Sequence, residues 1–150
     1  MPTSKKKRKQ GRKSVHSFTT AGTLPILFRT NAEDERTLKL MPHSDLAELR
    51  EGNGTEDSFR CVSSRINWAS ALASMNNFSF DPAPVINAGV EAMESLGKRA
   101  RQHGRYVLTG DELAAIGGAL TLADDMHDAT TRRQHRDALI KLMKYLPEKT

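Results

Sequence analysis

Apolar residues recur at steps of three and four along much of this chain, which is the spacing of one face of an α-helix. The clearest stripe consists of Phe59, Val62, Ile66, Ala69 and Ala73. Aromatic residues make up only 5% of the chain, so a core has to be built mainly from aliphatic and methionine side chains. Such a core suits packed helices better than a β-sandwich. The sequence therefore predicts an all-α protein, folded as an irregular helical bundle.

Capping residues divide the first half of this pattern into two helices. Ser44 is a plausible N-cap for a short helix over residues 45–51, which ends at residues 52–54. Before it, residues 31–36 are typical of a turn, and Leu38 and Leu40 give a weak strand signal. Thr55 is the predicted N-cap of a second helix, which ends at residues 76–77.

The second half contains stronger helix signals. Asp81 and Pro82 predict the start of a third helix, which ends at Gly104. Its expected apolar face consists of Val85, Gly89, Met93, Leu96 and Ala100. Thr109 and Glu112 fit a capping box at the start of a long C-terminal helix over residues 110–146. Two helices with a break near residues 128–131 are the alternative for this last segment.

Positive charge is concentrated near the N-terminus. Seven basic residues fall within nine positions: Lys5, Lys6, Lys7, Arg8, Lys9, Arg12 and Lys13. Without them the chain has 16 basic and 18 acidic residues, a net charge of about −2. Residues 1–23 also lack the apolar side chains that would offset the entropy lost on ordering. We therefore expect a disordered Lys/Arg-rich tail over residues 1–23 and a single helical domain over residues 24–150.

Closely spaced cations on such a tail displace counterions from nucleic-acid phosphates, which gives salt-sensitive, non-specific binding to DNA or RNA. The run from Lys5 to Lys9 also resembles a nuclear-localisation signal, and a tail that only aids solubility is the remaining alternative.

A second basic group lies at the end of the third predicted helix: Lys98, Arg99, Arg101, His103 and Arg105. Cations there complement the helix dipole, and they could also form a phosphate-contacting surface that acts with the tail. A third group is Arg132, Arg133, His135 and Arg136. We expect this group to pair within its helix, for example between Asp128 and Arg132.

No set of residues typical of an active site can be assembled. Asp124, His127 and Asp128 could share a helix face, but further metal ligands at a recognisable spacing are missing, so a solvated acidic face is expected. Cys61 lies beside an apolar stripe and is expected in or next to the core, as is Trp68. The sequence therefore predicts a protein that is not an enzyme and has no cofactor.

The sequence shows no sign of membrane insertion or secretion. One cysteine permits no intramolecular disulfide, and no run of 18 apolar residues predicts a transmembrane helix. The charged start is not followed by the apolar stretch of a secretory signal. A cytoplasmic location away from the membrane is the expectation.

Several short segments in this order carry a family resemblance. They are the basic start, Met41-Pro42-His43 before a Leu-rich helix, Arg65-Ile66-Asn67 with Leu72-Ala73, and residues 108–113 with the letters LTGDEL. The chain resembles a group of small proteins of unknown function encoded on proteobacterial phages and plasmids. The resemblance implies a helical fold, a cytoplasmic location and a mobile-element origin, but no activity and no site residues.

These observations favour an accessory or regulatory protein whose tail contacts nucleic acid and whose helical body binds an unidentified protein partner. The alternative is a protein-interaction module without a nucleic-acid role, including a homodimer formed through the long final helix.

Overall fold

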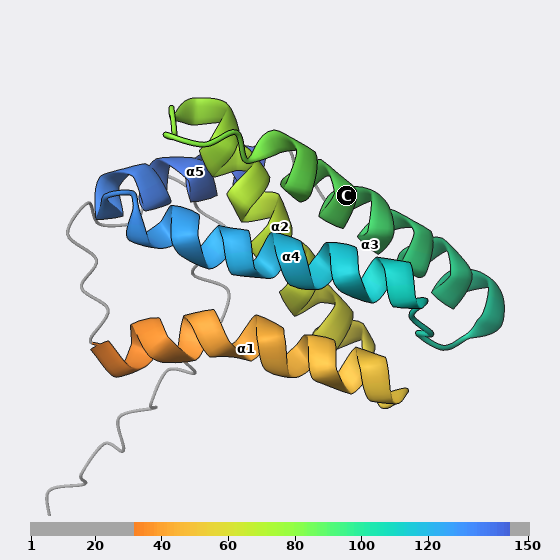
Figure 1. Ribbon diagram of the computed structural model, residues 1–150. Helices are drawn as coiled ribbons and strands as arrows, with labels where there is room; N and C mark the ends of the chain where they lie inside the picture. Colours follow the sequence, from red (N-terminus) through yellow and green to blue (C-terminus); the bar gives the residue numbers. More distant parts are fainter. Residues whose placement is uncertain (1–31, 145–150) are drawn as a thin grey trace, which may run out of the picture.

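The computed structural model describes residues 32–144, which form five α-helices and no strands (Figure 1). The helices are α1 (Ala32–Glu51), α2 (Glu56–Met75), α3 (Ala83–His103), α4 (Gly110–Asp128) and α5 (Arg132–Lys144). The all-α prediction is thus confirmed. None of the five helices is long and apolar enough to cross a membrane. The tail predicted over residues 1–23 lies outside the described residues.

Helix α2 is the centre of the arrangement, because it contacts each of the four other helices. Helices α3 and α4 run antiparallel and are joined by the loop over residues 104–109 (Figure 1). They share the most extensive helix contact of the fold. Helix α1 packs on α2 and α4, whereas α5 packs mainly on α2. Helix α2 therefore positions the other four helices of the described chain.

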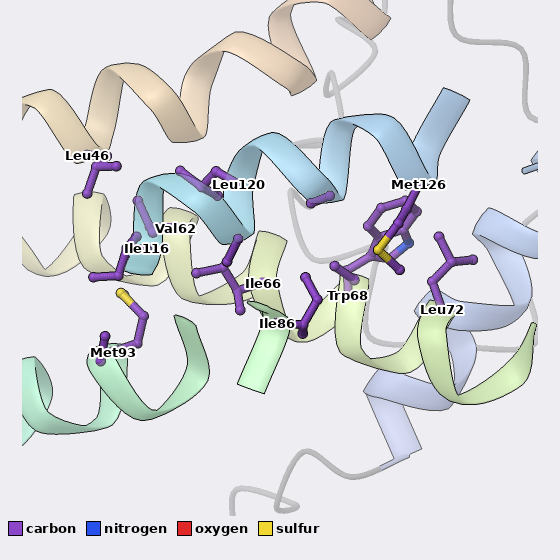
Figure 2. Close-up of a cluster of buried hydrophobic side chains, with 14 of the residues drawn as sticks. Leu46, Val62, Ile66, Trp68, Leu72, Ile86, Met93, Ile116, Leu120 and Met126 are labelled. Carbon is purple, nitrogen blue, oxygen red and sulfur yellow. The ribbon is translucent and has the colours of Figure 1, made fainter. Parts of the chain in front are cut away.

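The hydrophobic core lies where α1, α3 and α4 meet α2 (Figure 2). Its largest fully buried side chains are Val62, Ile66 and Leu72 from α2, Ile86 and Leu96 from α3, Ile116, Leu120 and Met126 from α4, and Leu49 from α1. Most of the predicted apolar face of α3 is buried, but Val85 is 42% exposed and Ile86 takes its place in the core. The predicted face therefore begins one residue too early, at Val85 instead of Ile86.

Close approach of α3 and α4 depends on one glycine. A Cβ atom placed on Gly89 would lie 2.5 Å from the Cβ of Ala119, well inside van der Waals contact. The absence of a side chain at Gly89 therefore sets the distance between the two helices. Gly118 differs, since a Cβ there would meet only the Val85 side chain, at 3.9 Å.

The predicted helix boundaries are mostly confirmed. The Thr55 hydroxyl accepts a hydrogen bond from the backbone N–H of Ser58, whose side chain accepts one from the backbone N–H of Thr55, which completes a capping box. Gly104 ends α3 in the left-handed conformation, with φ +72°. Thr109 caps α4 as predicted, but the Glu112 side chain binds Arg99 instead of reaching back to Thr109.

The first helix is longer than the sequence predicts. Helix α1 begins at Ala32 and continues through Pro42 and Ser44, so the turn, the strand and the Ser44 N-cap predicted there are wrong. Proline inside a helix costs about 3 kcal/mol, so Pro42 opposes this longer helix. Tertiary contacts offset this cost, because Lys39 pairs with Asp128 of α4 and Leu49 is completely buried.

The C-terminal segment is two helices and not one long helix. Helix α4 ends at Asp128 and α5 begins at Arg132, so the break lies where the alternative prediction placed it. The Thr130 hydroxyl donates a hydrogen bond to the backbone carbonyl of Met126, at 2.7 Å. A threonine hydroxyl can thereby satisfy a carbonyl at a helix end in place of the next backbone N–H.

Candidate nucleic-acid interface

The basic end of α3 is the part of the predicted interface that the structure describes. The seven basic residues of the tail, Lys5 to Lys13, lie outside the described residues. Lys98, Arg101 and Arg105 are exposed, and no ion pair within residues 32–144 engages them. Three of the four predicted body cations are therefore open to an external anion.

Arg99 is the exception in this group. Its guanidinium donates hydrogen bonds to a carboxylate oxygen of Glu112, at 2.6 Å, and to the backbone carbonyl of Val107, at 2.8 Å. The hydrogen bond with Glu112 raises the pKa of Arg99. Arg99 thus holds the loop between α3 and α4 in place, a role that explains it without any ligand.

A groove lies between α2 and α3, next to these cations. Its cavity volume is about 360 Å³. Apolar side chains and one glycine line part of it: Phe59, Ile66, Val90, Met93 and Gly97. Polar and charged side chains line the rest: Glu56, Arg60, Ser63, Asn67, Glu94, Arg101 and Tyr106. Arg101 lines the groove and also belongs to the basic end of α3, so the groove and this basic end form one continuous surface.

Two aromatic rings form the wall at one end of the groove. Phe59 of α2 and Tyr106 of the loop stack with ring centroids 5.2 Å apart and an interplanar angle of 22°. Gly97 of α3 makes room for them, because a Cβ there would lie 3.0 Å from the edge of the Phe59 ring. No sequence pattern predicted that Phe59 and Tyr106 stack. The only signal was that Tyr106 follows the turn at Gly104, which does not identify a partner 47 positions away.

The third basic group is held in other contacts. Arg132 approaches Glu35 of α1, at 3.6 Å, and Arg136 approaches Asp137, at 3.4 Å. The predicted pair between Asp128 and Arg132 is wrong, because Asp128 pairs with Lys39 of α1 and the two residues belong to different helices. Of this group, Arg132 connects α5 to α1, whereas Arg133 is exposed.

A polar cluster lies under α1, away from the groove. Asp124 of α4 accepts a hydrogen bond from Arg65 of α2, at 3.1 Å, and its other oxygen lies 2.8 Å from the His43 Nε2 of α1. The Arg65 guanidinium also lies over the Trp68 ring, 4.6 Å from its centroid. Trp68 is buried, as expected. Three helices are thus joined through one aspartate.

Two histidines extend this cluster toward α5. The rings of His127 and His135 lie with centroids 4.1 Å apart, and both are next to Trp68. Burial lowers the pKa of His127 to about 4, and the charges of neighbouring basic groups add to the effect. Burial also lowers the pKa of His135. Both rings are therefore neutral at pH 7, so this pair is part of the packed interior and offers no charge to a nucleic acid.

The remaining candidates serve structure in the described chain. Asp124, His127 and Asp128 do not converge, because Asp124 and Asp128 each face a different residue of α1. Within residues 32–144 no cluster of three or more potential metal ligands exists. Cys61 is half-buried, and burial together with a hydrogen bond to Asp45 raises the pKa of its thiol to about 12. A thiol with that pKa is a poor nucleophile at pH 7.

Comparison of the chain with protein-family models, curated proteins and solved structures finds no match. The resemblance to phage and plasmid proteins therefore stays a prediction. Any functional conclusion has to rest on the charge distribution and on the groove.

Proposed function

We propose that this chain is a non-enzymatic accessory protein that contacts nucleic acid without sequence preference and presents its helical body to a protein partner. The observation that supports the proposal is the separation of charge. Residues 32–144 contain 14 basic and 17 acidic residues, whereas residues 5–13 contain seven basic residues and no acidic one. Binding to phosphates is thus concentrated in the N-terminal segment.

The exposed cations of α3 support a second contact. Lys98, Arg101 and Arg105 lie at the C-terminal end of α3 or just after it, and no ion pair within the described residues engages them. Cations of this kind bind phosphates of any sequence, so they add affinity without adding base specificity. They orient the helical body on the strand to which the N-terminal segment binds.

A salt series tests this proposal. Binding of the full chain to random-sequence duplex DNA would be measured by fluorescence anisotropy at increasing salt. Each neutralised phosphate contributes a slope of about −0.9 in log affinity against log salt for duplex DNA, so seven contacts predict about −6. Deleting residues 1–13 should abolish binding while leaving the helical circular-dichroism signal unchanged. Binding that survives the deletion contradicts the proposal.

A second candidate is a protein-interaction module or homodimer without a nucleic-acid role. The long final helix that suggested a dimer is not observed, but α1 carries exposed apolar side chains that favour an interface. Leu38 is 53%, Leu40 57% and Met41 49% exposed. Light scattering of the wild type and of Leu40→Glu tests the dimer. A wild type that is monomeric at high concentration excludes it.

A further inference from the structure

The groove between α2 and α3 has the elements of a nucleotide site at the end where Phe59 and Tyr106 stack. Arg60 and Arg101 both line it, one from each helix. Arg105 precedes Tyr106 in the chain, and Lys98 lies one turn before Arg101 on α3. Aromatic surface and positive charge thus occur side by side.

Acidic residues of the groove cancel part of this charge. The Glu56 carboxylate is bound to the Arg60 guanidinium, at 2.5 Å. Glu94 lies seven residues before Arg101 on α3, which is about 10 Å along the helix axis. The charge of Arg60 is therefore neutralised, and the positive charge at this surface comes from Arg101, which lines the groove, and from Arg105, which precedes Tyr106 in the chain.

The groove also contains groups that can bind the edge of a base. Asn67 offers an amide with two N–H donors and one acceptor oxygen, and it donates a long hydrogen bond to the Ser63 hydroxyl, at 3.5 Å. Glu94 offers a carboxylate, which can accept from an exocyclic amine. Both groups line the groove.

We propose that this groove holds one unstacked nucleotide of a single-stranded nucleic acid. The base lies against the Tyr106 ring, and its phosphate contacts Arg101. A volume of about 360 Å³ is in the range of small-ligand sites and suits one base, whereas a base inside a duplex cannot enter it. The inference rests on the proposed function and adds a preference for single strands, which the N-terminal cations alone do not provide.

The test uses the full chain and two probes of the same random sequence, one single-stranded and one duplex, titrated by anisotropy at low and at high salt. The expected result is tighter binding of the single strand, with the difference most evident at high salt, where phosphate contacts are weakened. Stacking on an aromatic side chain persists under those conditions.

Two variants and one control locate the effect. Tyr106→Leu keeps an apolar side chain and should weaken single-strand binding by roughly tenfold, with little change for the duplex. Arg101→Ala removes an exposed side chain and should weaken the single strand severalfold. Arg133→Ala, an exposed cation of α5, should leave the preference for single strands unchanged. Thermal unfolding of each variant shows whether the fold is retained, and Arg101→Ala decides the outcome if Tyr106→Leu does not fold.

Two results overturn the inference. The first is equal binding of the two probes together with no effect of either variant. A salt-sensitive interaction with both probes would then still support the proposed function. The second is equal affinity for the strand and for a free nucleoside monophosphate, which would make the groove a site for small nucleotides. Absence of binding to either probe at low salt rejects the proposed function itself.

Discussion

Trp68 of α2 donates a hydrogen bond from its indole Nε1 to the backbone carbonyl of His135 in α5, at 3.3 Å. The two rings also meet edge to face, with centroids 5.4 Å apart. Since α5 packs mainly on α2, this pair connects the C-terminal helix to the buried interior, beside the hydrogen bonds of Gln134 with Asn76 and of Lys141 with Ser74. The tryptophan links the core to α5.

Replacing Trp68 by phenylalanine should lower the free energy of unfolding by about 2 kcal/mol. The substitution removes the indole donor and leaves the His135 carbonyl without this partner, and it also reduces the volume packed beside His127. Urea unfolding followed by circular dichroism measures the change. Asn77→Ala, at an exposed position of the neighbouring loop, serves as the control and should have little effect. Equal stability of Trp68→Phe and wild type would contradict this role.

Acidification should destabilise the fold through His127. Burial, the His135 ring and the cations Arg65 and Lys39 lower its pKa to about 4, and only Asp128 acts in the opposite direction. The unfolded chain binds a proton at this residue below about pH 6.5, whereas the folded protein does not until about pH 4. The stability that the neutral ring provides is therefore complete above pH 6.5 and is lost as the pH falls toward 4.

The measurement is the difference in unfolding free energy between wild type and His127→Gln across this pH range. Neutral glutamine cannot take up the proton, so the variant should lose less stability on acidification, by on the order of 2 kcal/mol. The Nδ1 atom of His127 has no hydrogen-bond partner among the described residues, so a proton there would be buried without an acceptor. Parallel pH profiles for the two proteins would refute the assignment to His127.

Two glycines provide a matched test of the contact between α3 and α4. Gly89→Ala places a methyl group 2.5 Å from the Ala119 Cβ, and short backbone-fixed atoms cannot rotate away. We expect a loss of about 1–3 kcal/mol despite the better helix propensity of alanine. Gly118→Ala meets nothing closer than 3.9 Å and should gain up to about 1 kcal/mol. Thermal unfolding distinguishes the two, and a stabilising Gly89→Ala would rule out the close contact.

Cys61 should react slowly with alkylating reagents in the folded protein. Burial and the hydrogen bond with Asp45 raise its thiol pKa to about 12, so little thiolate is present at pH 8. Iodoacetamide labelling followed by mass spectrometry should be slow in buffer and fast in denaturant. Asp45→Asn should accelerate labelling of the folded protein, since it removes the negative charge beside the thiol. Rapid labelling of the native wild type would show that the thiol is accessible and ionised.

Local capping chemistry made several helix boundaries predictable from sequence. Thr55, Thr109 and Gly104 act within three or four residues of their own positions, so their effects are visible without tertiary information. The N-terminal half of α1 was not predictable, because Pro42 disfavours a helix locally and Ser44 is a typical N-cap residue, which places a helix start too late. Contacts with α4, such as that of Lys39 with Asp128, join residues 89 positions apart and override the local preference.

The candidate site was predictable only in part. The exposed cations Lys98, Arg101 and Arg105 follow from their position at a helix end, but Arg99 looks equivalent in sequence and is instead bound to Glu112. The aromatic wall of the groove depends on how α2 and the loop after α3 meet. No periodic pattern links Phe59 to Tyr106, so this part required the fold.

The attachment of α5 has a consequence for how the protein opens. Only Ala138 of this helix is fully buried, while Leu139 and Leu142 pack against the core and stay partly exposed, and Gln134 donates a hydrogen bond to Asn76 at the end of α2. Detaching α5 exposes less apolar surface than separating α2, α3 and α4, so the free energy of that partial opening is below that of global unfolding. Amide hydrogens of α5 will therefore exchange with solvent as a separate cooperative unit, while those around Ile66 and Leu120 exchange only when the whole molecule unfolds.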